Sequence, residues 1–232
     1  FIFLNAQTAS LPKNAPISVL SSIKTVDIKH TSEISTFDPT WVDSLSLSLP
    51  CYGIPVPKRT MRLPNAPRNY RNGTHRGLDF FANWGTPVRS VADGIVVRSD
   101  LHYEEVPADF RENLLKATTK VGYTPSDIFN SVLLGKSVFL DHGFDLIPGF
   151  RTISIYAHLS HIEKEIVPGA VVKRGELLGK SGNTGMREST IGSKAGSHLH
   201  WEMILQKGEQ EIYLGKGMSN PELYDMLLRI FN

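Results

Sequence analysis

The chain has 232 residues, 41% of them hydrophobic and 21% charged, and its net charge is +2. This is the composition of a folded domain with its own core, and the charge is too small to favour a nucleic-acid partner. No apolar run reaches the roughly 18 residues of a membrane span, and the single cysteine, Cys51, excludes an internal disulfide or a cysteine-rich zinc cluster. The opening FIFLNAQ lacks the basic start of a complete signal peptide, although it could be a remnant near a processing point; no pattern specifies an oligomeric state.

Residues 1–63 are predicted to form an N-terminal extension that differs in composition from the rest of the chain. They are rich in Ser, Thr, Pro and Asn, and the alternating SLSLSL at 44–49 predicts a half-buried strand. Five prolines between Pro50 and Pro67 predict an extended, irregular connector, since proline supplies no backbone donor.

Residues 64–232 are predicted to form the main domain, and its pattern is mostly β. Short runs such as KSVFLDHG, RTISIYAHLS and HLHWEMIL are separated by Gly, Asp and Asn turns. Repeated short strands with such turns favour a mainly β fold, a sandwich or a barrel-like core.

A two-helix insertion is predicted at about 107–135. Residues 107–121 carry Phe110, Leu114 and Leu115 at helical spacing, with Gly122 as the stop, and Thr124 can cap a second helix. The insertion could line a substrate groove, although a cover over a sheet edge is the favoured interpretation.

A short amphipathic helix is predicted at about 221–231, capped by Asn220, with a structural role.

The stretch GSHLHWEM places two histidines on one face of a predicted strand. Side chains alternate along a strand, so His198, His200 and Glu202 point one way, and the apolar side chains between them point the other way. Spacing alone leaves two alternatives open, a solvated face with idle histidines or a metal or catalytic site.

NGTHRGLDFF adds His75 and Asp79, four residues apart. In a straight strand the two would lie about 13 Å apart, too far for one ion with bonds of about 2.0–2.2 Å. A shared metal therefore requires a sharp bend, which Gly77 would permit. SIYAHLSH places His158 on the same polar strand face as Tyr156.

The remaining histidines have weaker support. His161 falls past a strand end and receives no role, and His142 with Asp141 is expected to be structural. His30 and His102 are expected at the surface.

The candidates are thus His75, Asp79, His158, His198 and His200. Two imidazoles and one carboxylate suit zinc with a fourth position open for water, and two further imidazoles can move protons. This inventory is what metal-assisted amide hydrolysis needs. The sequence has no Cys–His pairing, G-x-S-x-G elbow or phosphate loop.

Five blocks in order, HRGLDF, GTPVRSVADGIVV, YAHLS, VVKRGELLGKSGNTG and HLHWE, resemble the lysostaphin-type (LytM-like) zinc metallopeptidases of bacterial cell walls. The resemblance covers about residues 64–205. It implies a compact antiparallel β-sheet core with a groove, one zinc ion per chain, and an endopeptidase acting on peptidoglycan peptides. It also implies an extracytoplasmic location, in the periplasm, at the wall or secreted.

The resemblance also assigns roles position by position. The family's metal ligands fall on His75, Asp79 and His200, and its two catalytic histidines fall on His158 and His198.

Two departures from the family pattern concern the groove rim: the helical insertion and the long loop at 185–197. Some relatives also use an upstream asparagine as a fourth metal ligand, a role for which Asn65 and Asn69 are weak candidates.

Two other functions remain as alternatives. Some relatives have lost ligands and act as non-catalytic regulators of other wall hydrolases, but no such loss is present here. VADGIVV with PGAVVKRGELLG also resembles the half-barrels of lipoyl and biotinyl carrier modules, but the turns here carry ADG and SGN instead of a protruding lysine.

Overall fold

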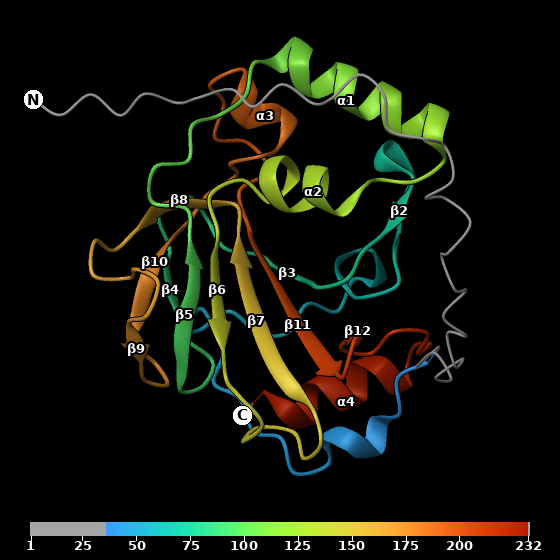
Figure 1. The fold of residues 1–232 in the computed structure, drawn as a ribbon, viewed down its shortest axis with the longest axis vertical. Coiled ribbons are helices and arrows are strands. Elements are labelled where there is room, and N and C mark those ends of the chain that lie inside the picture. Colours follow the sequence, from blue (N-terminus) through green and yellow to red (C-terminus); the bar gives the residue numbers. More distant parts are fainter. Residues whose placement is uncertain (1–35, 232) are drawn as a thin grey trace, which may run out of the picture. The chain divides into compact units, whose positions relative to one another are not determined.

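A computed structural model describes residues 36–231 (Figure 1), which belong to one compact unit. His30 lies outside the described residues. Residues 36–63 share the core of the β-sheet, to which Val42, Leu47 and Leu63 contribute buried side chains. The division at residue 63 stays a prediction.

The described chain is mainly β, and all of its strand ladders are antiparallel. The largest sheet has the order β12 (Gln210–Tyr213), β11 (Leu199–Lys207), β7 (Arg151–Ala157), β6 (Val138–Asp141), β5 (Gly94–Ser99) and β9 (Val171–Val172), and β3 (Leu78–Phe80) also pairs with β11. A second sheet has the order β4 (Pro87–Arg89), β10 (Leu177–Ser181) and β8 (Leu159–Ile162), and β1 (Pro67–Arg68) pairs with β2 (Gly73–Thr74). The predicted β fold is confirmed, but within residues 36–231 no sheet closes into a barrel.

One face of the large sheet packs on the main core. Trp201 and Tyr156 are fully buried there, and Phe231 makes edge-on ring contacts with Trp201 and with Phe80. Burying such large aromatic side chains supplies much of the apolar area that stabilises a domain.

The strand predicted at 44–49 is not formed. Leu45 and Leu47 are buried and Ser44 and Ser46 are exposed, as the alternation predicts, but only Leu47 makes a bridge, with Phe231. Extended chain that lies on a core shows the same alternating burial as a strand, without the ladder.

The other face of the sheet is covered by the insertion. It consists of α1 (Ala108–Val121), the single turn α2 (Ser126–Ile128) and a π-helical turn at Phe129–Leu133. Phe129 and Leu133 pack in a second apolar cluster with Ile155 of β7 and Ile204 of β11. The insertion therefore covers a sheet face and not the sheet edge that the sequence favoured.

Of the two caps predicted for the insertion helices, the structure contains the one at Gly122 and not the one at Thr124. Gly122 ends α1 with a left-handed φ of 87°, as expected. Thr124 does not cap α2, because its hydroxyl donates to the backbone carbonyl of Arg71.

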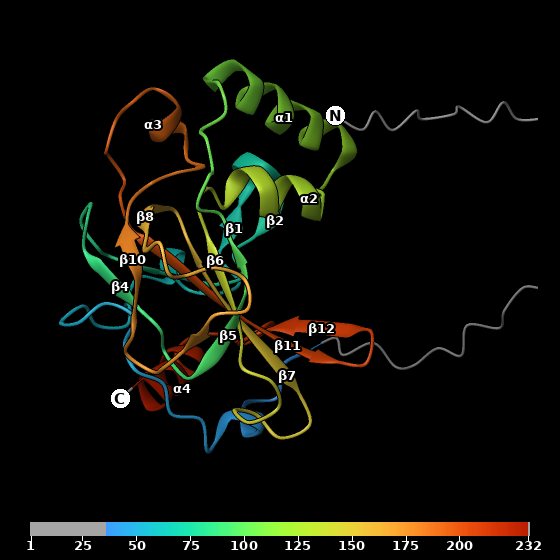
Figure 2. The same cartoon turned by 60° about the vertical axis from the view of Figure 1, so that its left-hand side comes forward.

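The remaining helices are short: α3 (Arg187–Thr190), α4 (Glu222–Ile230) and 3-10 turns at Pro39–Val42, Thr60–Arg62 and Asn69–Arg71. Asn220 makes no capping hydrogen bond to α4. Figures 1 and 2 show α1, α2 and α3 gathered at one end of the large sheet, with α4 at the other. Among residues 36–231, no helix has the length and hydrophobicity needed to cross a bilayer.

Candidate metal centre

Strand pairing brings Asp79 and His200 together. In the antiparallel ladder of β3 and β11, His200 lies directly opposite Asp79, and on its other side it lies opposite Ala157 of β7. Side chains of directly opposed residues emerge on the same face of a sheet. The register therefore aims one carboxylate and one imidazole at the same point.

His75 reaches this point because the chain before β3 runs tight against β11. A Cβ atom on Gly77 would lie 2.2 Å from the carbonyl oxygen of Trp201, so only glycine allows this approach. Gly77 is not among the residues with positive φ. The sequence singled out Gly77 as the residue that permits a sharp bend; in the structure glycine is required there by close contact with β11.

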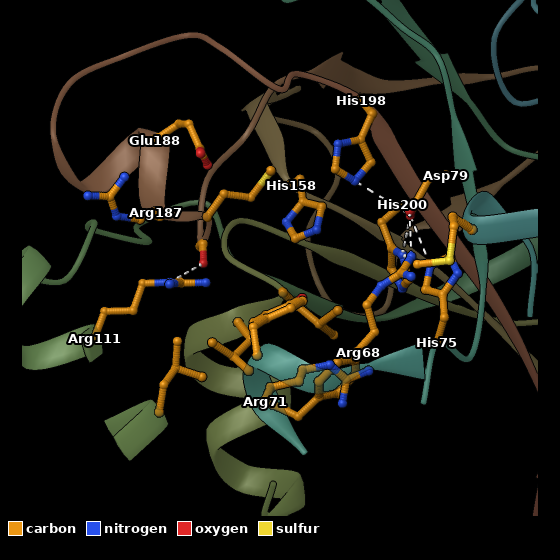
Figure 3. A pocket seen from close by; sticks show the side chains of 18 of the residues that line it. Arg68, Arg71, His75, Asp79, Arg111, His158, Arg187, Glu188, His198 and His200 are labelled. Atoms are coloured by element: carbon orange, nitrogen blue, oxygen red, sulfur yellow. Dashed lines mark hydrogen bonds and ion pairs between the residues drawn. The ribbon is translucent and has the colours of Figure 1, made fainter. Parts of the chain in front are cut away.

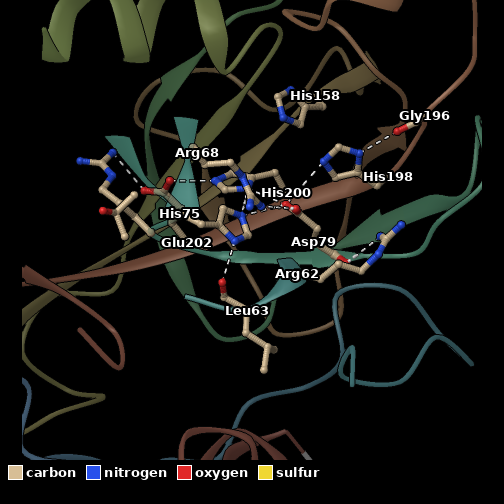
Figure 4. Close-up of polar contacts among 12 residues, drawn as sticks. Arg62, Leu63, Arg68, His75, Asp79, His158, Gly196, His198, His200 and Glu202 are labelled. Carbon is tan, nitrogen blue, oxygen red and sulfur yellow. Dashed lines mark hydrogen bonds and ion pairs between the residues drawn. The ribbon is translucent and has the colours of Figure 1, made fainter. Parts of the chain in front are cut away.

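Three ligand atoms converge at this point (Figure 4). His75 Nε2 lies 3.0 Å from Asp79 Oδ1 and 3.1 Å from His200 Nδ1, and His200 Nδ1 lies 2.9 Å from Asp79 Oδ1. In a tetrahedral site with bonds of about 2.0–2.2 Å the ligand atoms are about 3.3 Å apart. The three atoms are spaced as ligands of one ion.

Hydrogen bonds on the outer side of each ring fix which nitrogen faces the centre. His75 Nδ1 lies 2.8 Å from the Leu63 carbonyl, which can only accept, so Nδ1 carries the hydrogen. His200 Nε2 lies 2.7 Å from Glu202 Oε1. The inward atoms are then acceptors that share at most one proton, an arrangement that a cation satisfies.

Charges around the centre also suit a cation. Burial alone would raise the pKa of Asp79, but His75 and the hydrogen bonds from His198 and His200 hold it well below its usual range. Burial alone would lower the pKa of His200, but hydrogen bonds with Asp79 and Glu202 raise it to about 9. In the chain without an ion, His200 carries the proton that a metal would displace.

Four supporting groups escaped the sequence analysis as site residues. Glu202 is fully buried and pairs with Arg76 at 3.0 Å, while Arg68 pairs with the outer oxygen of Asp79 at 2.9 Å. The fourth group is the carbonyl of Leu63. Glu202 had a signal, its place on the same strand face as the two histidines, and Arg76 lies within the HRGLDF block. Arg68 and Leu63 come from the proline-rich connector, which carries no site motif.

His158 and His198 lie beside the three ligand atoms, with ring centroids 4.9 Å apart. His158 Nδ1 lies 2.8 Å from the Thr184 carbonyl, and His198 Nδ1 lies 2.7 Å from the Gly196 carbonyl. Both rings therefore carry a hydrogen on Nδ1. His198 Nε2 approaches Asp79 Oδ1 to 3.5 Å.

His158 does not occupy the face predicted for it. The strand ends at Ala157, Tyr156 points into the core, and His158 adopts a left-handed φ of 60°. This conformation is rare for a residue with a side chain and occurs disproportionately at functional sites. It leaves the ring of His158 with its centroid 5.6 Å from that of His200.

The pKa of His158 is well below its ordinary value. Burial is the main cause, and the neighbouring imidazoles of His198 and His200 add to it. His158 is therefore neutral at pH 7, with a free lone pair on Nε2.

Other candidates from the sequence lie outside this cluster. His142 is hydrogen-bonded to Asp93 and Ser154, and His161 lies 3.7 Å from Glu163 at the surface. The side chain of Asn65 is engaged elsewhere, with Gly215, Met218, Tyr213 and Gly217. His102 is exposed, as expected.

The cluster opens into a groove of about 590 Å³ (Figure 3). The wall away from the ligand atoms is built by the insertion, with Arg111 and Leu115 of α1 and Phe129 of the π-helical turn, and by Met186 and Glu188 of the long loop. Both sequence departures thus line the groove.

Comparisons with known proteins indicate the family of this chain. A family model described as peptidase family M23 matches residues 73–212. An uncharacterized metalloprotease of Haemophilus influenzae is 31% identical over 128 residues, 55% of this chain and 18% of the relative. Another, from Buchnera aphidicola, is 26% identical over 141 residues, 61% of this chain and 26% of the relative. The chain therefore spans about a quarter or less of the length of these relatives.

Among solved structures, the catalytic domain of lysostaphin, an antimicrobial peptidase of Staphylococcus simulans, matches with a TM-score of 0.40 and 19% identity, over 81% of this chain and 96% of that domain. The family model covers more than half of the chain and includes all five clustered residues. This chain belongs to peptidase family M23.

Proposed function

We propose that this protein is a zinc-dependent endopeptidase that hydrolyses amide bonds in peptidoglycan peptides. The observation that carries the proposal is the convergence of three acceptor atoms, from His75, Asp79 and His200, next to two further imidazoles in a groove. These three residues would hold one zinc ion. When bound, zinc acts as a Lewis acid that acidifies water and polarises a carbonyl.

In this proposal His158 is the base. Its Nδ1–H is fixed by the Thr184 carbonyl, and its depressed pKa keeps Nε2 unprotonated at neutral pH. Nε2 is thus the atom that accepts a proton from the attacking water, which then forms the new bond to the carbonyl carbon. His158 then returns that proton to the nitrogen of the leaving amine when the carbon–nitrogen bond breaks.

His198 stabilises the oxyanion in this proposal. Its Nδ1–H is fixed by the Gly196 carbonyl, so Nε2 is the nitrogen directed toward Asp79 and the centre. In its protonated form, an imidazole so oriented would donate a hydrogen bond from Nε2 to the developing oxyanion. The two rings therefore have fixed orientations before substrate binds.

The peptide class of the substrate follows from membership of a peptidase family, and peptidoglycan follows from the resemblance of the five sequence blocks. The groove beside the cluster, of about 590 Å³, falls within the size range of sites that bind small ligands. A peptidoglycan substrate would place the protein outside the inner membrane, in the periplasm or at the wall.

The test is hydrolysis of purified peptidoglycan of several wall chemistries by zinc-loaded protein. We expect loss of turbidity and release of muropeptides, abolished by a chelator and restored by zinc. Mass spectrometry of the products identifies the bond cut. Absence of release from every wall type, with one zinc ion bound per chain, would contradict the proposal; stimulation of a separate amidase in that case would indicate the regulatory alternative.

A further inference from the structure

The groove contains more positive charge than its acidic side chains neutralise. Seven charged residues line it: Arg68, Arg71, Asp79, Arg111, Glu112, Arg187 and Glu188. Arg68 is paired with Asp79, and Arg187 lies 3.9 Å from Glu112. Arg111 and Arg71 make no ion pair within residues 36–231.

Arg111 is 8% exposed, although its side chain reaches from α1 to the groove (Figure 3). Its Nε–H donates to the Gly185 carbonyl at 2.9 Å. The four N–H groups of Nη1 and Nη2 make no hydrogen bond within the described chain. These groups are not among the fully buried polar atoms that lack a partner, so they are accessible from the groove, where an anion could reach them.

The nearby acidic groups do not supply that partner. Glu105 makes no ion pair with Arg111 in the described chain. Its two carboxylate oxygens accept hydrogen bonds from the Gly185 N–H and the Tyr103 hydroxyl. Glu188 lines the groove but makes no ion pair with Arg111 in the described chain.

Arg71 adds a second buried guanidinium to the groove. It is 7% exposed, donates from Nη2 to the Thr74 carbonyl at 2.6 Å, and lies over the ring of Phe129 at 4.6 Å. Its position is fixed by these contacts, so it supplies a permanent positive charge to the wall of the groove.

We propose that Arg111 binds a carboxylate of the peptide substrate, in a groove whose positive field Arg71 reinforces. The inference rests on the proposed function, because it assigns a subsite for the same substrate. The planar fork of a guanidinium matches a carboxylate with two parallel hydrogen bonds. Carboxylates are also the anionic groups that a peptide can present. The insertion thus sets substrate preference for peptides with free carboxylates.

The test compares one synthetic cross-linked peptide dimer in three forms: all carboxylates free, only the C-terminal carboxylates amidated, and all carboxylates amidated. We expect zinc-loaded wild-type protein to cleave the free form with a kcat/KM about 10- to 100-fold above that of the fully amidated form, the effect of a hydrogen bond to a charged group. The partly amidated form shows whether a terminal or a side-chain carboxylate is bound.

The variants Arg111→Gln and Arg111→Lys separate binding from a structural role. We expect the preference for the free form to fall to near one in Arg111→Gln and to an intermediate value in Arg111→Lys, which keeps the charge but loses the fork. Loss of the Gly185 contact alone would slow all three forms equally. Arg229→Gln, an exposed arginine of α4 that pairs with Asp43, is the control and should keep the wild-type preference.

Two results would overturn the inference: wild-type protein that does not distinguish the three forms, or a wild-type preference that persists in both Arg111 variants. Fluorescence anisotropy of labelled dimers on metal-free protein provides a readout that does not need turnover. If no form is cleaved but metal-free protein still binds the free form more tightly, in an Arg111-dependent way, the proposed function fails and the carboxylate subsite stands.

Discussion

Two groups of histidines lie at opposite ends of β7, and they differ in how their nitrogens are satisfied. His142, beside the first residues of β7, has one partner for each nitrogen: Nδ1 lies 2.6 Å from the Asp93 carbonyl and Nε2 lies 2.7 Å from the Ser154 hydroxyl. At the other end, His75 Nε2 and His200 Nδ1 face each other and Asp79 Oδ1, and these three inward atoms share at most one proton.

The difference shows what distinguishes a metal centre from a structural histidine. Both groups are buried, and both keep an imidazole in a fixed orientation. Among these described residues, three acceptor atoms face one point with at most one proton among them at the candidate metal centre and not at His142, so a cation would improve the hydrogen-bonding balance there. Burial and a fixed ring orientation are common to both ends and do not separate them.

The largest effect is expected from His200→Ala. Loss of one of three ligands, together with its contact to Glu202, should abolish zinc binding and hydrolysis together. Zinc content by elemental analysis and release from peptidoglycan give the two readouts. His142→Gln is the matched control, a buried histidine changed at the other end of β7, and it should keep one zinc per chain. A His200→Ala protein that retained stoichiometric zinc would show that the three acceptors are not the ligands.

His158→Ala should separate turnover from metal binding. The ring lies beside that of His200, with centroids 5.6 Å apart, but its hydrogen bond is to the Thr184 carbonyl and not to a ligand residue, so zinc content should be unchanged. Loss of a proton carrier should lower kcat by about 10²- to 10⁴-fold. Zinc loss in this variant would instead place His158 among the ligands.

Glu202→Gln should weaken the centre without removing a ligand. The carboxylate accepts from His200 Nε2, and loss of such a partner costs about 10- to 100-fold in metal affinity. Competition with a chelator of known zinc affinity measures the change. Glu209→Gln, the same substitution at an exposed position of the β11–β12 turn, should leave the affinity unchanged. An equal affinity in both variants would mean that Glu202 only balances the charge of Arg76.

The components of the site could be predicted from sequence, but their geometry could not. The H-x-H strand pattern, the distance problem between His75 and Asp79, and the glycine between them all came from local sequence. The register that sets Asp79 opposite His200 depends on pairing between residues 121 positions apart, which no local pattern encodes. The left-handed backbone of His158 also depends on its surroundings, since its backbone N–H donates to the carbonyl of Leu134 in the insertion.

The same limit explains the fold-level errors. Helix α1 was predictable because apolar spacing and a glycine stop are local signals. The cap at Thr124 failed because a carbonyl 53 residues away takes the hydroxyl. The strand at 44–49 failed because alternating burial reports contact with a core and not hydrogen bonds to a neighbouring strand.

The smallest expected effect concerns the satisfied histidine. His142→Gln should lower the free energy of unfolding at pH 7.5 by about 1–2 kcal/mol, since two buried hydrogen bonds are replaced by poorer ones. Urea denaturation measures the difference, and zinc content and hydrolysis should stay at the wild-type level. A change in zinc binding would show that the two ends of β7 are coupled.

The pH dependence of that difference tests whether His142 is neutral in the folded protein. Burial lowers the pKa of His142 below its ordinary value of 6.5, against the Asp93 carbonyl and Asp141. Below pH 6.5 the unfolded chain then binds a proton at His142 that the folded chain does not. The contribution of His142 to the free energy of unfolding is therefore complete above pH 6.5. It is lost as pH falls below that value, by up to about 1.4 kcal/mol per pH unit. Glutamine does not titrate, so at equal zinc occupancy the stability gap between the two proteins should narrow from pH 7.5 to pH 5.5. If the difference in free energy of unfolding widened on acidification, the folded protein would raise the pKa of His142. His142 would then not be a neutral structural histidine, and the contrast with the candidate metal centre would fail.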